Sequence, residues 1–284
     1  MSDSRRRFGP MPDEVPIVGQ GTWQMAESRQ DAGEIAALRA GIARGLTHID
    51  TAELYGSGAA EELIAQAIRG IPRGELFIVS KVLPHNASRA GTLRACEKSL
   101  RRLGVDYLDV YLLHWRGSVS LAETLGALEE LVDQGKIRAL GVSNFDVGDL
   151  EEARALLRKH PIACNQVLYH LGERHVEAEL VGYCETHDIA VVGYSPFGHG
   201  RFPPAPRAGA RALAAVAARH GATPRQVALA FLARATPLFT IPKASTLAHA
   251  EENAGALDVA LSAADIAEID AAFPVRVGSE LPAI

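Results

Sequence analysis

Short apolar segments alternate with amphipathic ones along almost the whole chain, and this alternation limits the folds that the sequence can adopt. The apolar segments have the length of buried strands. Stretches such as 34–45 repeat apolar residues at the i, i+3, i+4 and i+7 spacing of a helix that packs on one side only. We expect an N-terminal hairpin and then strands at 16–23, 47–53, 76–82, 108–115, 139–144, 164–169, 190–196 and 237–244. The helices are expected at 31–45, 58–70, 88–104, 120–135, 147–160, 176–188, 211–221 and 247–257.

Eight strand–helix pairs in 284 residues predict an α/β protein whose residues 1–284 form a single (β/α)8 TIM barrel domain. An open, doubly wound sheet is the competing fold. Its dinucleotide-binding turn would need a third glycine after Gly19 and Gly21, and the chain has Gln24 at that position. The barrel is therefore favoured. Glycines that suit left-handed helix ends follow several expected helices, at Gly45, Gly70, Gly104 and Gly135.

Composition points to a small-molecule ligand. The net charge is −5 and lysines and arginines form no long runs, which argues against a nucleic-acid partner or an anionic membrane surface. Three dispersed cysteines predict neither a disulfide framework nor a metal site, and no run approaches the roughly 18 apolar residues of a membrane span. We expect a cytoplasmic protein, with oligomeric state left open and a monomer compatible. The arginines at 5–7 are interpreted as a solvated tail.

Residues 198–211, GHGRFPPAPRAGAR, form the main stretch rich in proline and glycine. They follow the seventh expected strand. Two interpretations stand equally: a flexible connection, or a basic strap over an anionic ligand that uses Arg201, Arg207 and Arg211.

Ionisable residues stand at the ends of expected strands, where a barrel of this kind carries its active site. They are Asp50, Tyr55 just beyond it, Lys81 and His114. Each alone has an ordinary structural explanation, such as a helix cap for Asp50 or an interface aromatic for Tyr55. All four together point to acid–base chemistry.

A phenol is a poor proton donor at neutral pH, and a nearby ammonium lowers its pKa by favouring the phenolate. Lys81 would supply that charge to Tyr55, and Asp50 would keep Lys81 protonated on burial. His114 would polarise or orient a carbonyl. Together these groups would protonate a carbonyl oxygen as negative charge develops on it.

None of these four groups supplies hydride, so a cofactor is required. Amide and hydroxyl side chains suited to a carboxamide, and a tyrosine ring suited to stacking, stand at the ends of later strands: Ser143, Asn144, Gln166, Tyr194 and Ser195. Groups suited to a phosphate precede an expected helix: Lys243, Ser245 and Thr246.

These motifs resemble the aldo-keto reductase family over nearly the whole chain, from VGQGTW through GLTHIDTAELYG, VSKV, DYLDVYLLHW, GKIRALGVSNF, NQVLYH and YSPFG to IPKAST and EEN. Within the family, NQVLYHLG and IPKASTLAHAEENA resemble bacterial reductases of methylglyoxal and similar small aldehydes. The resemblance implies an Asp50, Tyr55, Lys81 and His114 tetrad, and NADPH stacked on Tyr194 with its carboxamide on Ser143, Asn144 and Gln166. It also implies that Thr22, Asp50, Ser195, Lys243, Glu252 and Asn253 line the rest of the cofactor path.

Trp23 and Trp115 would be walls of the substrate pocket, with ordinary packing at the rim as the alternative. The chain departs from the family pattern at three places. Ala244 and His249 replace a serine and an arginine near the cofactor's 2′-phosphate, which would weaken the preference for NADPH over NADH. Leu83 replaces an aromatic pocket residue, and only eleven residues follow Phe273, so we expect a short C-terminal loop and an open pocket.

The sequence therefore predicts reversible NADPH-dependent reduction of small aldehydes, with Tyr55 as the proton donor. Two other functions are weighed against it. A lyase would form a Schiff base on Lys81, which pairing with Asp50 opposes. A non-catalytic cofactor sensor would bind NADPH and a partner protein without turnover.

Overall fold

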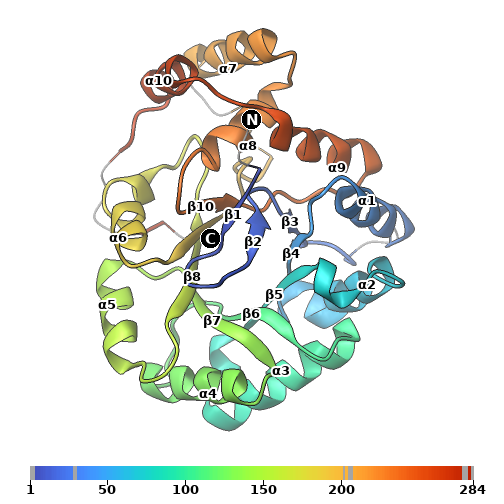
Figure 1. The fold of residues 1–284 in the computed structure, drawn as a ribbon, viewed down its shortest axis with the longest axis vertical. Coiled ribbons are helices and arrows are strands. Elements are labelled where there is room, and N and C mark those ends of the chain that lie inside the picture. Colours follow the sequence, from blue (N-terminus) through green and yellow to red (C-terminus); the bar gives the residue numbers. More distant parts are fainter. Residues whose placement is uncertain (1–3, 28–30, 201, 204–206, 277–280, 283–284) are drawn as a thin grey trace.

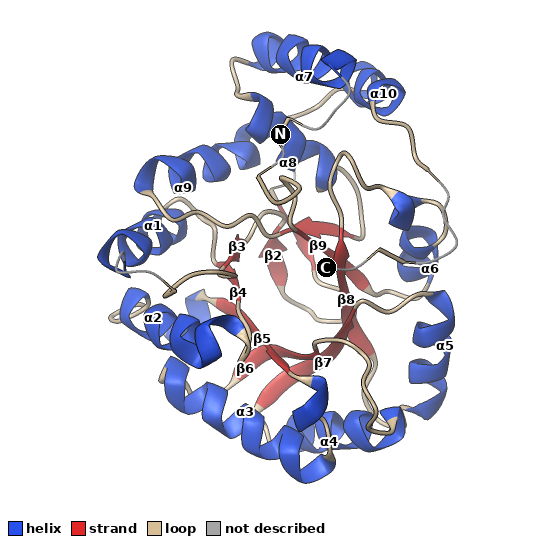
Figure 2. Ribbon diagram, turned by 180° about the vertical axis from the view of Figure 1, so that it is seen from behind, coloured by secondary structure: helices blue, strands red, loops and turns tan. Residues whose placement is uncertain are grey.

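A computed structural model describes residues 4–27, 31–200, 202–203, 207–276 and 281–282, without the side chain of residue 207. Eight parallel strands follow one another around a curled sheet, and bridges from Val18 to Thr240 and from Gly21 to Lys243 join its last strand to its first. Figure 2 shows this ring of strands inside a ring of helices. The predicted (β/α)8 barrel is confirmed. Its strands are β3 (Gln20–Gly21), β4 (His48–Asp50), β5 (Phe77–Val82), β6 (Leu108–Leu113), β7 (Ile137–Ser143), β8 (Ile162–Leu168), β9 (Ala190–Tyr194) and β10 (Leu238–Thr240).

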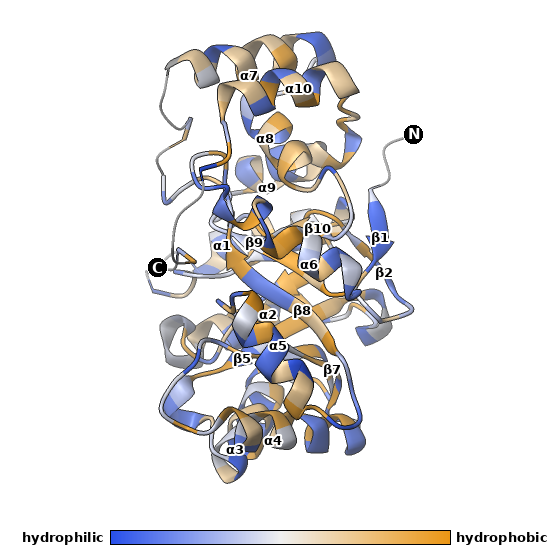
Figure 3. Ribbon diagram, turned by 90° about the vertical axis from the view of Figure 1, so that its left-hand side faces the viewer, coloured by the Kyte–Doolittle hydropathy of each residue, from blue (hydrophilic) through white to orange (hydrophobic). Residues whose placement is uncertain are grey.

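Amphipathic helices cover the outside of the sheet. The covering helices are α1 (Asp31–Ala43), α2 (Ala59–Ala67), α3 (Arg89–Leu103), α4 (Leu121–Asp133), α5 (Val147–Leu156), α6 (Leu180–Thr186), α8 (Pro224–Leu232) and α9 (Leu247–Ala254). Short 3-10 turns also occur, at Tyr55–Gly58, Arg73–Glu75, Pro84–Asn86, His175–Glu177 and Gly255–Asp258. The four glycines expected to follow helices all have positive φ values. Figure 3 shows hydrophobic residues gathered on the central strands.

The seventh strand–helix pair differs from the prediction. The expected helix at 211–221 belongs to α7 (Arg207–His220), which packs against α8 and α10 (Ala263–Ala272) and lies with α10 beyond the ring of helices (Figure 1). Helix α8, which the sequence reading missed, contacts β10 in the covering position. Helix α10 was also missed.

The predicted hairpin is present, as β1 (Arg5–Arg7) paired antiparallel with β2 (Glu14–Pro16). The interpretation of residues 5–7 as a solvated tail was wrong in one part: these arginines form β1, while Arg5 and Arg7 are exposed as expected. The guanidinium of Arg6 donates to the backbone oxygens of Leu238 and Ala233, at 3.0 Å each. Figure 1 shows the hairpin lying across one end of the barrel.

Phe8, which follows β1, is fully buried against the rings of Phe77 and Phe239, with centroids 4.8 and 4.9 Å away. The barrel interior below the site is therefore filled with side chains. No helix in the described part of the chain is long and apolar enough to cross a membrane.

Candidate active site

Strand periodicity aims the predicted site residues into the barrel. Alternate residues of a strand face the same side. Phe77 and Val79 of β5 belong to the inner apolar cluster, so Lys81, two residues on, faces inward at the end of the strand. By the same spacing His114 follows Val110 and Leu112 of β6.

Lys81 is the centre of the polar cluster. Its Nζ donates to Asp50 Oδ1 at 2.6 Å, to the Thr51 carbonyl oxygen at 2.8 Å and to the Tyr55 hydroxyl oxygen at 3.3 Å. The Lys81 side chain is fully buried and that of Asp50 is 2% exposed. Lys81 therefore contacts directly a segment of the chain that lies 26 to 31 positions before it.

The electrostatics of this cluster differ in one respect from the expectation. Burial lowers the pKa of Lys81, but the charges of Asp50 and Tyr55 outweigh it, so that this pKa is raised and the ammonium is retained. Burial raises the pKa of Tyr55 above 10.0, and Lys81 opposes this shift without reversing it. Burial also raises the pKa of Asp50, against Lys81 and Gln166. The net acidification of the phenol that we expected is absent from the resting site.

Tyr55 reaches the cluster from a tight turn after β4. Gly56 has φ 55° and Gly58 has φ 98°, conformations that glycine adopts at little cost. A Cβ atom on Gly58 would lie 2.6 Å from the Arg102 side chain. The GSG sequence thus allows a turn that leaves the phenol facing His114, whose ring centroid is 5.8 Å from that of Tyr55.

His114 is held as a neutral imidazole. Burial, followed by the charge of Lys81, lowers its pKa to about 2. Its buried Nδ1 has no hydrogen-bond partner among the described residues. A neutral ring of this kind can donate or accept a hydrogen bond but adds no charge to the site.

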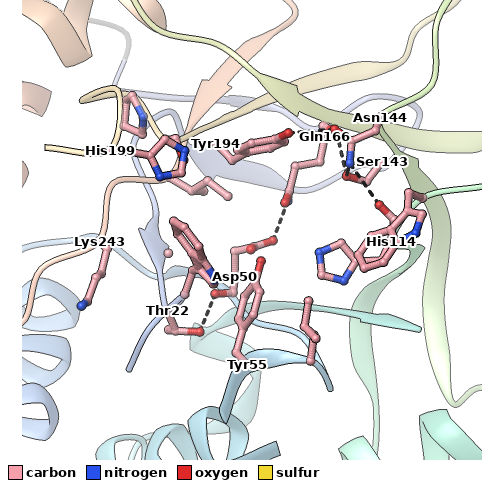
Figure 4. Close-up of a pocket in the computed structure, with 17 residues that line it drawn as sticks. Thr22, Asp50, Tyr55, His114, Ser143, Asn144, Gln166, Tyr194, His199 and Lys243 are labelled. Atoms are coloured by element: carbon pink, nitrogen blue, oxygen red, sulfur yellow. Dashed lines mark hydrogen bonds between the residues drawn. The ribbon is translucent and has the colours of Figure 1, made fainter. Parts of the chain in front are cut away.

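Amide and hydroxyl groups form the opposite wall. Gln166 Nε2 donates to Asp50 Oδ2 at 2.6 Å, and the Tyr194 hydroxyl donates to Asn144 Oδ1 at 2.9 Å. Asn144 Nδ2 in turn donates to Ser143 Oγ, at 3.2 Å. Figure 4 shows Gln166 and Tyr194 above Asp50, with Tyr55 and His114 on the other side. Asp50 therefore links the amide wall to Lys81.

These groups line one cavity of about 310 Å³ at the rim. The cavity contains most of the predicted site residues: Thr22, Trp23, Asp50, Tyr55, His114, Trp115, Ser143, Asn144, Gln166, Tyr194, Ser195 and Lys243. Sequence reasoning missed five other lining residues, Gly21, Leu54, Pro196, His199 and Ile241. His199 lies in the glycine-rich stretch that the sequence marked, but attention there went to the arginines.

Other predicted residues lie away from the cavity. Leu83 is not among the lining residues, and its backbone nitrogen donates to Glu53 Oε1 at 2.8 Å. The predicted residues around α9 lie beyond Lys243, outside the cavity: Ser245, Thr246, His249, Glu252 and Asn253. Thr246 caps α9 by accepting from the His249 backbone nitrogen at 3.3 Å.

Only part of the predicted basic strap lies among the described residues. Arg201 and the Arg207 side chain lie outside the described residues. Arg211 is exposed on α7 and does not line the cavity. His199 occupies the cavity wall instead, edge-to-face with Trp23 at 5.1 Å between ring centroids.

The arrangement can hold a proton on Tyr55 and a cation beside it, next to a cavity with an amide-lined wall. Among the described residues, no group of three or more His, Cys, Asp or Glu side chains is placed to hold a metal ion. The contact of the Tyr55 hydroxyl with the Lys81 ammonium suits proton transfer between this side chain and a bound molecule.

Comparison with known proteins finds a matching family model, similar enzymes and a similar crystal structure. A family model described as the aldo/keto reductase family matches residues 18–273. The chain is 47% identical over 269 residues to methylglyoxal reductase YeaE of Escherichia coli, covering 93% of each protein, and 38% identical over 260 residues to glyoxal reductase of Bacillus subtilis, covering 91% and 89%. The crystal structure of an aldo-keto reductase from Klebsiella pneumoniae in complex with NADPH matches with a TM-score of 0.92 and 44% identity, covering 100% of both chains.

Proposed function

Because the chain belongs to the aldo/keto reductase family, we propose that it uses NADPH to reduce small aldehydes, including 2-oxoaldehydes such as methylglyoxal, to alcohols. The observation that carries the proposal is the placement of Lys81 Nζ between Asp50 Oδ1 and the Tyr55 hydroxyl. Relatives named methylglyoxal reductase and glyoxal reductase support the substrate class. The match to an NADPH complex supports the cofactor.

The amide wall fits a nicotinamide ring and its carboxamide. Gln166 uses its Nε2 on Asp50, which leaves its Oε1 to accept from an amide N–H. Ser143 and Asn144 stand beside it, and Tyr194 offers a ring face. Bound there, NADPH supplies the hydride that no side chain of the site can provide.

The side chains supply the proton. Tyr55 donates it to the carbonyl oxygen of the substrate, and the Lys81 ammonium stabilises the phenolate that results. Asp50 keeps Lys81 charged and directed at Tyr55. His114, neutral and with its ring beside Tyr55, orients the same oxygen by a hydrogen bond.

The rest of the cavity suits a small substrate. Trp23 and Trp115 line it and are 38% and 39% exposed, so they form apolar walls at an open mouth. Leu54 adds a third apolar side chain, 41% exposed. We favour this role as pocket walls over simple packing at the rim, because all three side chains face the cavity.

We further propose that the preference for NADPH over NADH is weak. Lys243 lines the cavity, and its bond to the Gln24 carbonyl oxygen at 3.2 Å uses one of the three donors of its ammonium, which leaves two for an anionic group. Near it, Ala244 has no polar side chain and His249 lacks the bidentate donors of an arginine. A 2′-phosphate would therefore add little to the affinity of the protein for the cofactor.

The test follows NADPH absorbance with methylglyoxal in the wild type and in Tyr55→Phe. We expect the variant to lose about 10²- to 10⁴-fold in kcat, the usual contribution of a general acid, while it still binds NADPH. Tyr107→Phe is the matched control, because Tyr107 precedes β6 at the opposite end of the barrel. Wild-type turnover in Tyr55→Phe would refute the proposed role of this residue.

Two alternative functions receive less support. A Schiff-base lyase needs a deprotonated lysine, whereas Asp50 and Tyr55 raise the pKa of Lys81 over the opposing effect of burial. A non-catalytic cofactor sensor would need tight NADPH binding without turnover on any aldehyde.

We also propose a cytoplasmic location, since the three cysteines are buried and unpaired.

A further inference from the structure

The loop after β9 contacts an arginine, Arg225, that does not line the cavity. The Arg225 guanidinium carbon lies 4.6 Å from the ring centroid of Phe197 and 5.2 Å from that of Phe202. The two rings meet nearly edge-to-face, 5.3 Å apart. Both distances from the guanidinium are within the range of a cation–π contact. One cation thus contacts both Phe197 and Phe202.

The same loop forms part of the cavity wall. Ser195, Pro196 and His199 line the cavity, and His199 contacts the ring of Trp23. Phe197 lies between these residues in the sequence but contacts Arg225 instead. A shift of Phe197 would therefore move the lining residues on both sides of it.

Within the loop the Gly198 backbone nitrogen donates to the Ser195 carbonyl oxygen at 2.8 Å, and several residues have left-handed backbone. Ser195 and His199 have φ of 53° each, and Gly198 and Gly200 have φ of 58° and 79°, so these described residues of the loop form no regular helix or strand. Left-handed backbone is unfavourable for non-glycine residues and persists only where surrounding contacts hold it. Contacts such as those of Phe197 with Arg225 and Phe202 are what would hold it here.

Arg225 itself sits on a fixed support. It is the second residue of α8, whose start is closed by a capping box between Thr223 and Gln226. Gln226 Nε2 also donates to the Glu252 carbonyl oxygen of α9 at 3.0 Å. Arg225 does not line the cavity, so it would act on a ligand through the loop.

We propose that Arg225 is a positioning residue for cofactor binding: by holding Phe197 and Phe202, it sets the wall formed by Ser195, Pro196 and His199. This inference rests on the proposed function, because it assumes that the cavity binds a nicotinamide dinucleotide. The wall would contact the part of the molecule that NADPH and NADH share. Loss of the anchor would therefore weaken both cofactors alike.

The experiment measures the dissociation constants of NADPH and NADH by quenching of tryptophan fluorescence. Arg225→Ala should raise both constants by a similar factor, about fivefold or more, as expected for the loss of partly desolvated cation–π contacts. Arg225→Lys, which keeps the cation, should recover most of the affinity. Arg211→Ala is the matched control, an exposed arginine on α7 away from the cavity, and should bind both cofactors like the wild type.

A second variant tests the contact itself. Phe197→Leu should weaken binding in the same way, and combining it with Arg225→Ala should add little, because the two residues share one interaction. Unchanged affinity in Arg225→Ala overturns the proposal. So does a loss confined to NADPH, which would show a direct contact with the 2′-phosphate. A wild-type protein that bound neither cofactor would instead defeat the proposed function.

Discussion

The ion pair between Lys81 and Asp50 makes the sharpest prediction about this fold. Asp50→Asn keeps the size of the side chain and removes its charge. Lys81 would remain fully buried, with the Thr51 carbonyl and the Tyr55 hydroxyl as neutral partners. An ammonium in such a place has lost its hydration and its counter-charge together.

The size of the effect follows from distance and burial. At the 2.6 Å separation of Nζ and Oδ1, an effective dielectric constant of about 20 gives a gross attraction of about 6 kcal/mol. Desolvation offsets part of this attraction, and removing one partner of a buried pair typically costs about 3–5 kcal/mol. We therefore expect Asp50→Asn to lower the free energy of unfolding at pH 7 by about 3–5 kcal/mol, a large share of the stability of an ordinary domain.

Urea unfolding followed by circular dichroism would measure the loss. The matched control is Asp188→Asn, which breaks a pair with Arg7 of the same 2.6 Å length whose side chains are 58% and 49% exposed. Asparagine tolerates the φ of 58° at this position, so the control should cost less than about 1 kcal/mol. Equal losses in the two variants would refute the reasoning.

The double variant Asp50→Asn/Lys81→Met isolates the stranded charge. It should recover most of the stability, because neither position of the pair then carries a charge. The dependence on pH has a definite sign. In the wild type the pKa of Lys81 is raised above 10.5, so the pair's contribution persists up to that pH and is lost as pH rises through the folded-state value. In Asp50→Asn the lowering of the Lys81 pKa by burial is less opposed. The difference in the free energy of unfolding between this variant and the wild type should therefore narrow as pH rises toward 10.

Two further predictions concern activity. The kcat for carbonyl reduction should stay flat from about pH 6 to about pH 9 and fall only above pH 10, because burial raises the pKa of Tyr55 and the donor must be protonated. Burial also lowers the pKa of His114 to about 2. A titration near pH 6.5 that disappears in His114→Gln would therefore contradict this account. His249→Arg should increase the ratio of kcat/KM for NADPH to that for NADH by about tenfold, the equivalent of about 1.4 kcal/mol from a charge-assisted contact, and an unchanged ratio would place the 2′-phosphate elsewhere.

Much of the fold could be predicted because a parallel barrel imposes a simple pattern. Each strand must be apolar and each helix must carry one apolar face, so the order of segments specifies the topology. The same pattern located the site, since Asp50, Lys81, His114 and Gln166 come at strand ends and share the inward parity of their strands. Spacing along single strands was enough to bring these residues together.

The errors arose where tertiary contacts decide between equivalent segments. Helices α7 and α8 are both amphipathic, and only packing shows that α8 covers β10. Arg6 of β1 read as solvated because its partners are backbone oxygens of residues more than 200 positions away. His199 was overlooked for a similar reason, as its contact is with Trp23 from the opposite part of the chain.

The raised pKa of Tyr55 is compatible with its proposed role. A general acid must keep its proton until negative charge develops on the substrate oxygen, and burial ensures this in the resting site. As the proton leaves, the oxygen of Tyr55 becomes an anion 3.3 Å from an ammonium that Asp50 already holds in place. Lys81 then stabilises the product of proton transfer more than the starting phenol, which is the condition for lowering the barrier. In the proposed mechanism the cation acts through its position during the reaction, whereas burial mainly sets the pKa of Tyr55 in the resting site.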